Sequence, residues 1–128
     1  MVTRRALLLL LVVLAGCDDN GIRPDGPAAP GPLPQRIEYR VIGSIRNVDI
    51  KYSNAAQGTT FVTADPPWGV LFTTTRPRTY VYLEAAAPPF NSVSGPLVAQ
   101  ILVDGELFRE ATARGFTPVV IVSGEVVR

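Results

Sequence analysis

The sequence lacks histidine altogether and has a single cysteine among its 128 residues. Without histidine it has no imidazole base near neutral pH, no Ser-His or Cys-His nucleophile pair, and no His-ligated metal. One cysteine cannot form an internal disulfide, and a thiolate metal cluster needs several. The sequence also has no excess of one charge, because 12 Lys and Arg are balanced by 11 Asp and Glu. The net charge therefore gives no general attraction to nucleic acid. These absences predict a protein that is not an enzyme, uses no cofactor or metal, and binds no nucleic acid.

The N-terminus carries the one long apolar run. Arg4 and Arg5 precede residues 6–14, which are all apolar but fall short of the roughly 20 residues of a membrane span. This pattern is typical of a secretory signal peptide. Its end, Leu14-Ala15-Gly16-Cys17, resembles the bacterial lipobox, in which the cysteine is acylated. We therefore predict a lipoprotein signal peptide over 1–16 and lipidation of Cys17; the alternatives are a plain secreted protein with a leftover thiol, or a short membrane anchor.

The acidic residues Asp18 and Asp19 follow the cysteine directly. In enterobacterial lipoproteins, an aspartate at this place resembles the signal for retention in the inner membrane. The expected location is a lipid-anchored protein on the periplasmic or other extracytoplasmic face of the cell membrane, the inner membrane in a Gram-negative host. The alternative is that the two aspartates merely open a solvated linker.

Residues 17–35 have the composition of a tether. Five prolines and three glycines lie between Asp18 and Pro34, with no apolar periodicity for a helix or strand to bury. Proline favours an extended polyproline II path of about 3.1 Å per residue, so these 17 residues would reach roughly 50 Å when fully extended. The segment is predicted to be a disordered spacer.

The remaining residues, 36–128, predict an all-β domain. Val48, Ile50 and Tyr52 alternate with polar residues, which is the period of a half-buried strand. Similar short runs, separated by Gly, Pro, Asn or Ser, occur at 37–41, 47–52, 59–63, 68–74, 79–83, 97–103, 106–112 and 116–122. Seven or eight such strands predict an antiparallel, immunoglobulin-like β-sandwich, with a small barrel as the alternative.

Two local signals refine this fold. Asp104-Gly105 lies between two alternating runs and predicts a type I′ hairpin turn, which needs positive φ at both residues. Pro118 falls inside the last run, and a proline there indicates an edge strand or a bulge because it cannot donate to the ladder.

Four residues are candidates for contact with a partner. Trp68, after Pro66-Pro67, and Phe90, in the 87–91 loop, are aromatic residues beside rigid turns, where binding residues tend to lie. The alternative for both is that they fill the ends of the core. Arg76 and Arg78 form a small basic cluster beside two tyrosines, suited to lipid headgroups or a protein partner.

Several stretches of the domain occur in a characteristic order and spacing: 39–43, 48–55, 67–68 and 101–106, followed by Glu110 and Gly115. In these stretches the domain resembles the soluble domain of the MmpS family, small mycobacterial membrane proteins of the actinobacterial envelope. This resemblance implies a non-catalytic β-sandwich and an accessory role to RND-type (MmpL) exporters. The chain departs from the family in having a lipobox-like sequence in place of the transmembrane helix and in lacking the cysteine pair that many members carry in late strands.

Two functions are therefore expected from the sequence. The first is a non-catalytic envelope lipoprotein that presents a β-sandwich interaction domain and serves as an accessory to an exporter. The second is a β-sandwich lipoprotein that binds a small ligand or glycan, because Tyr80 and Tyr82 share a strand face with Glu84.

Overall fold

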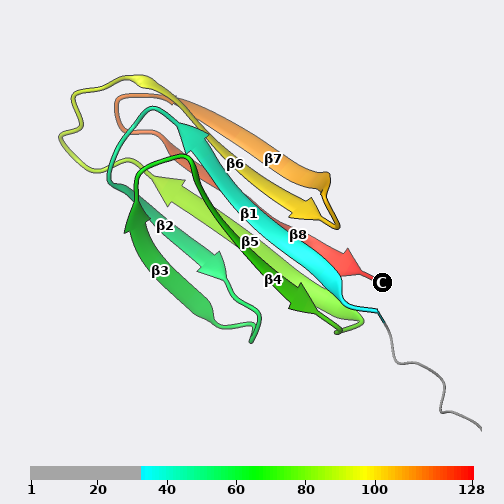
Figure 1. The fold of residues 1–128 in the computed structure, drawn as a ribbon. Helices are drawn as coiled ribbons and strands as arrows, with labels where there is room; N and C mark the ends of the chain where they lie inside the picture. Colours follow the sequence, from blue (N-terminus) through cyan, green and yellow to red (C-terminus); the bar gives the residue numbers. More distant parts are fainter. Residues whose placement is uncertain (1–32) are drawn as a thin grey trace, which may run out of the picture. The chain divides into compact units, whose positions relative to one another are not determined.

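The computed structural model describes residues 33–128, and they form eight β-strands (Figure 1). All eight predicted strands are confirmed, although β5 and β8 both run further than their apolar alternation indicated. The signal peptide, Cys17 and the predicted tether up to residue 32 lie outside the described residues. The described part contains no helix long and apolar enough to span a membrane. The strands are β1 (Gln35–Gly43), β2 (Val48–Ser53), β3 (Thr59–Ala64), β4 (Trp68–Thr74), β5 (Arg78–Ala86), β6 (Gly95–Val103), β7 (Glu106–Gly115) and β8 (Val119–Val127).

The strands build two antiparallel four-stranded sheets, which confirms the β-sandwich. One sheet has the order β4-β1-β6-β7 and the other β3-β2-β5-β8. Strands β2 and β3, and likewise β6 and β7, pair as consecutive neighbours, while every other connection between the described strands crosses from one sheet to the other. Immunoglobulin-like domains share this two-sheet architecture without always sharing one strand order.

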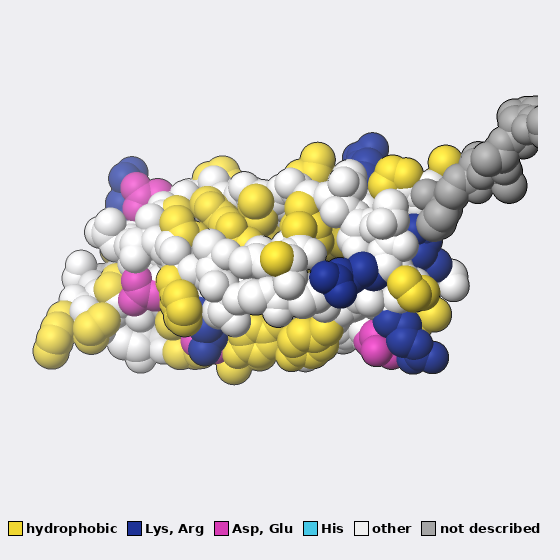
Figure 2. Space-filling model, turned by 90° about the horizontal axis from the view of Figure 1, so that it is seen from below, with side chains coloured by type: hydrophobic (Ala, Val, Ile, Leu, Met, Phe, Trp, Pro, Cys, Tyr) yellow, Lys and Arg dark blue, Asp and Glu magenta, His cyan; other side chains and the backbone are white. Residues whose placement is uncertain are grey.

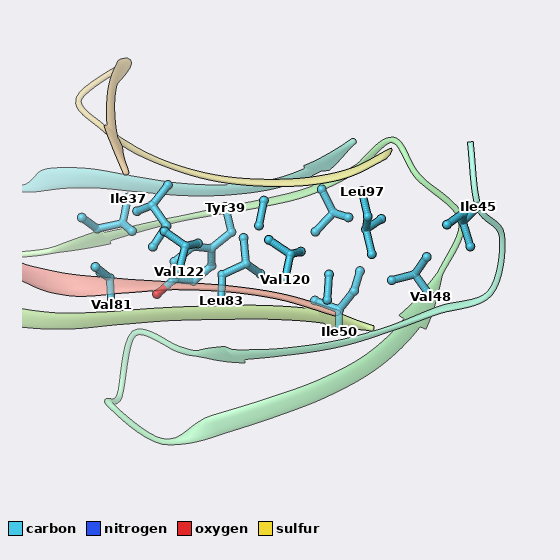
Figure 3. Close-up of a cluster of buried hydrophobic side chains, with 14 of the residues drawn as sticks. Ile37, Tyr39, Ile45, Val48, Ile50, Val81, Leu83, Leu97, Val120 and Val122 are labelled. Carbon is cyan, nitrogen blue, oxygen red and sulfur yellow. The ribbon is translucent and has the colours of Figure 1, made fainter. Parts of the chain in front are cut away.

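The core lies between the sheets and follows from the alternation of the strands (Figure 3). In β1, Ile37, Tyr39 and Val41 are fully buried, while Glu38 and Arg40 face outward and pair with each other at 2.7 Å. Fully burying one such aliphatic side chain stabilises the fold by about 1.5–3 kcal/mol. The same inward alternation supplies further core residues from the other strands: Val48, Ile50, Val81, Leu83, Ala85, Leu97, Ala99, Ile101, Val120, Val122 and Val126. Ile45 joins the core from the connection between β1 and β2.

One polar link crosses this core. The Tyr39 hydroxyl donates to the Ser53 carbonyl oxygen at 2.8 Å and lies 2.9 Å from the Ser53 Oγ. The Ser53 Oγ in turn accepts a hydrogen bond from the backbone N–H of Tyr82 at 3.0 Å. Burial raises the pKa of Tyr39, because the interior disfavours its charged form. The two sheets are thus joined by a satisfied hydrogen-bond network, as a buried hydroxyl requires.

Trp68 extends the core at the start of β4. Its ring lies 5.4 Å, centroid to centroid, from that of Tyr52, and Tyr52 lies 5.5 Å from Tyr39. Phe72 closes the cluster on the other side of Tyr39, at 5.7 Å. Trp68 is partly buried, which favours the core alternative over an exposed contact.

The predicted hairpin turn is confirmed. Asp104 has φ of 51° and Gly105 has φ of 85°, both in the left-handed region that a type I′ turn requires. The Asp104 carboxylate also accepts a hydrogen bond from the backbone N–H of Arg36 at 2.9 Å, which ties the turn to β1. Pro118 lies just before β8 and not inside it, but β8 is an edge strand as expected. The Pro118 carbonyl accepts from the backbone N–H of Ala87 at 2.9 Å.

The strand directions sort the connections into two ends of the domain. The proximal end holds the start of β1, beside which the C-terminus lies (Figure 1). The backbone N–H groups of Asp104 and Arg128 bond there to the carbonyls of Arg36 and Pro77. Every strand-to-strand connection therefore belongs to one end: 54–58, 75–77 and 104–105 are proximal, and 44–47, 65–67, 87–94 and 116–118 are distal.

Candidate contact surfaces

The distal end displays a cluster of apolar side chains, here called the apolar tip: Phe90, Val93 and Phe116. Phe90 is 98% exposed, Phe116 is 57% exposed and Val93 is 46% exposed. Hydrophobic side chains protrude at this end of the domain (left end of Figure 2). The Asn91 Nδ2 donates to the carbonyls of Val93 and Phe116, so one side chain holds the two loops together. These hydrogen bonds therefore hold the two loops of the tip in a defined arrangement.

Phe90 sits in an unusual backbone conformation, with φ of 63°. A bulky residue with positive φ is uncommon because Cβ crowds the carbonyl, and the strain amounts to about 1–3 kcal/mol. The Phe90 ring is almost completely exposed, so no burial of apolar area offsets this backbone strain. Strained residues of this kind cluster at binding and switch sites, which makes Phe90 a candidate contact residue on two independent grounds.

The four partner-binding residues predicted from the sequence do not form one surface. Arg76 lies in the proximal turn between β4 and β5, and Arg78 begins β5 beside it. Both are exposed, and the Arg78 Nη1 pairs with Glu125 Oε1 at 3.0 Å. Phe90 lies in the loop at the opposite end of β5, and Trp68 packs on the aromatic core. The arginines and Phe90 therefore lie at opposite ends of the domain.

A second candidate surface lies on the outward face of the β3-β2-β5-β8 sheet. We call it the aromatic groove: Lys51 from β2, Phe61 from β3, and Tyr80, Tyr82 and Glu84 from β5. The tyrosine rings stack at 6.4 Å with an interplanar angle of 27°. The Lys51 Nζ lies 5.9 Å from the centroid of the Phe61 ring and 5.8 Å from that of Tyr82. Lys51 also pairs with Glu84 Oε1 at 3.6 Å.

The Tyr82 hydroxyl donates to Glu84 Oε1 at 2.6 Å. This hydrogen bond raises the pKa of Tyr82 to about 12, from an ordinary value of 10.0. The proton is thus held more tightly in the folded than in the unfolded chain. The resulting stabilisation is complete below pH 10 and is lost as the pH rises from 10 to about 12.

We therefore expect Tyr82→Phe to lose less stability than the unmodified protein between pH 10 and about 12, because the variant has no hydroxyl proton there to lose. The measurement is the midpoint of urea unfolding at a series of alkaline pH values. Glu84→Ala, which removes the acceptor, should behave in the same direction. Identical pH dependence in all three proteins would contradict the role of this hydrogen bond.

Neither surface offers a metal site or a recognisable catalytic arrangement. Among residues 33–128, no group of three or more Asp, Glu, His or Cys side chains could hold a metal ion. In the β6-β7 hairpin, the exposed Glu110 accepts a hydrogen bond from Gln100 Nε2 at 2.6 Å. The apolar tip offers exposed aromatic area for burial, and the aromatic groove offers rings for stacking and side chains for hydrogen bonding.

Sequence reasoning found Phe90, Tyr80, Tyr82 and Glu84 but did not single out Phe61 and Lys51. The signal lay in the register: Lys51 is directly opposite both Phe61 in β3 and Glu84 in β5. The alternation of apolar and polar residues does not reveal which strands pair. These cross-strand neighbours can therefore be identified only from the three-dimensional structure. No family model matches this chain, and no curated protein matches it.

Proposed function

We propose that this protein is a non-catalytic envelope lipoprotein whose β-sandwich binds a protein partner through the apolar tip. The observation that carries the proposal is Phe90, an aromatic residue that is 98% exposed and held at positive φ at the distal end. Exposed aromatic residues on a rigid loop are typical anchors of protein contacts, since a few such residues supply most of the binding energy.

The placement of the tip supports this role. β1 begins at the proximal end, so a lipid on Cys17 would hold the domain from that end and leave the distal loops free to meet a partner. A proline-rich segment of 17 residues between them would give a reach of up to roughly 50 Å. The proximal Arg76 and Arg78 are then better suited to lipid headgroups or to a second contact near the membrane than to the surface that Phe90 serves.

The proposed partner is the extracytoplasmic part of an RND/MmpL-type exporter. This identification comes from the resemblance of residues 39–43, 48–55 and 101–106 to the MmpS soluble domain. The tip residues Phe90, Val93 and Phe116 carry no charge, so the partner should offer an apolar hollow. Arg46, which lines the same hollow as Phe90 and Val93, pairs with Asp65 at 3.3 Å.

The ligand-binding alternative concerns a different surface. Its supporting observation is the aromatic groove, where stacked tyrosines and a paired lysine share one sheet face. The two roles are compatible in one molecule because the apolar tip and the aromatic groove share no residue.

Photo-cross-linking in intact cells tests the proposed contact. A photoreactive amino acid at position 90 should yield an adduct with an integral membrane transport protein, identified by mass spectrometry. The matched control is position 107, because Leu107 is also an exposed apolar residue but lies at the proximal start of β7. The same adduct from both positions, or no envelope protein from position 90, would contradict the proposal.

A further inference from the structure

The geometry points to a second binding site in this protein: the aromatic groove as a site for a neutral oligosaccharide. This inference rests on the ligand-binding alternative given above and names the class of ligand; the site lies on a sheet face and not at the distal end that holds the apolar tip. It consists of two adjoining hollows of about 500 and 370 Å³ that share Lys51 and Phe61. The first continues over Asp49, Thr63 and Glu84, and the second over Gln57, Tyr80 and Tyr82.

The groove exposes aromatic rings where a sheet usually carries polar side chains. Phe61 is 73% exposed and Tyr80 is 52% exposed, on the face of the sheet that points away from the core. Aromatic rings present a negative π-face, which attracts groups with partial positive charge. The C–H groups on one face of a pyranose ring have this character. The rings of Phe61 and Tyr80 therefore match the apolar face of a sugar.

The polar side chains around the rings match the hydroxyl groups of the same ligand. Lys51 can donate hydrogen bonds, while Glu84 and Asp49 can accept them. Each is already oriented: Lys51 pairs with Glu84 at 3.6 Å, and Asp49 accepts from Thr63 Oγ1 at 2.9 Å. Aromatic walls with a few oriented polar groups are the usual composition of a specific ligand site.

The charge of the groove selects against ionic ligands. One cation, Lys51, stands against two carboxylates, Asp49 and Glu84, which disfavours phosphate or uronate groups. A cationic ligand would compete with the Lys51 Nζ, which already lies near the rings of Phe61 and Tyr82 at 5.9 and 5.8 Å. A neutral, hydroxyl-rich ligand has neither penalty, so the occupant is a neutral glycan.

The length of the groove indicates more than one sugar unit. Its lining runs along β5 from Tyr80 to Ala86, and a strand rises about 3.3 Å per residue, which gives about 20 Å. The two hollows share Lys51 and Phe61 in their linings, so a ligand that extends from one to the other passes over these two side chains. An oligosaccharide chain laid along the strands would fill both.

The site is tested by titrating the full-length, detergent-extracted protein with cellotetraose, maltotetraose and mannotetraose. Binding is measured by tyrosine fluorescence and by calorimetry. At least one neutral tetrasaccharide should bind, and tetragalacturonate should bind at least about tenfold more weakly. Phe61→Ala and Tyr80→Ala should each weaken binding by about tenfold or more, which corresponds to about 1.4 kcal/mol for a lost aromatic contact. Both side chains are exposed, so these variants should fold normally.

Leu107→Ala is the matched control, because Leu107 is also an exposed apolar residue, 55% exposed, but lies on the other sheet. It should leave glycan binding unchanged. Phe90→Asn should do so too, which separates this site from the proposed partner contact. Absence of binding to all three neutral tetrasaccharides, equal binding of tetragalacturonate, or unchanged affinity in Phe61→Ala and Tyr80→Ala would each overturn the proposal.

Discussion

Cys17→Ala is expected to abolish incorporation of labelled palmitate and to release the protein from the membrane fraction. The expected anchor is lipid on this cysteine, and each buried methylene of an acyl chain contributes about 0.8 kcal/mol to membrane binding. The apolar run at residues 6–14 is much shorter than the roughly 20 residues of a span, so it cannot replace the lipid. The loss should therefore be close to complete.

The matched control for this prediction is the double variant Asp18→Asn with Asp19→Asn. It keeps the cysteine and should keep palmitate incorporation, while changing only the expected retention signal. The measurement is fractionation of labelled cells in high salt, which removes proteins held by charge alone. A Cys17→Ala protein that remains in the washed membranes would show that residues 6–14, and not a lipid, form the anchor.

The positions of the strands could be predicted because burial on one face imposes a period of two. Val48, Ile50 and Tyr52 show this period without interruption, and Val48 and Ile50 are buried in the fold. The hairpin at Asp104-Gly105 was equally readable, since few residue pairs accept positive φ twice in succession. Local chemistry of this kind does not depend on the rest of the chain.

The ends of β8 were harder to predict. Pro118 was expected inside the strand, but the structure begins β8 at Val119 and continues it to Val127. Ser123, Gly124 and Glu125 interrupt the apolar pattern, yet they pair with Tyr82, Val81 and Tyr80 of β5. Backbone pairing with a long neighbouring strand extends β8 beyond the point where side-chain hydrophobicity signals it.

The composition of the two candidate surfaces also depends on the tertiary fold and could not be predicted from local sequence. That Phe90 is exposed follows from the distal loops and the Asn91 hydrogen bonds, which no local pattern reveals. The aromatic groove required the pairing of β2 with both β3 and β5. The sequence could name chemically suitable residues, but it could not say which of them would share a surface.

Phe90→Asn is expected to weaken partner binding by about thirtyfold or more while leaving the fold as stable as before, or more stable by about 1 kcal/mol. Phenylalanine is strained at φ of 63°, whereas asparagine adopts this left-handed conformation readily. The exposed ring gives up little buried area when it is removed, because it is 98% exposed. A hot-spot aromatic residue is worth about 2 kcal/mol or more in an interface, so affinity should fall by about thirtyfold or more.

This combination of unchanged or raised stability with lost binding distinguishes a contact residue from a packing residue. Leu107→Asn provides the comparison, because Leu107 is also an exposed apolar residue but lies in β7. This substitution should change neither the stability nor the partner affinity strongly. Thermal unfolding measures the stability, and co-purification of the transport protein cross-linked from position 90 measures the binding. A lowered melting temperature would show that Phe90 packs within the domain. Full retention of the partner by Phe90→Asn would show that the strained loop serves something other than this contact.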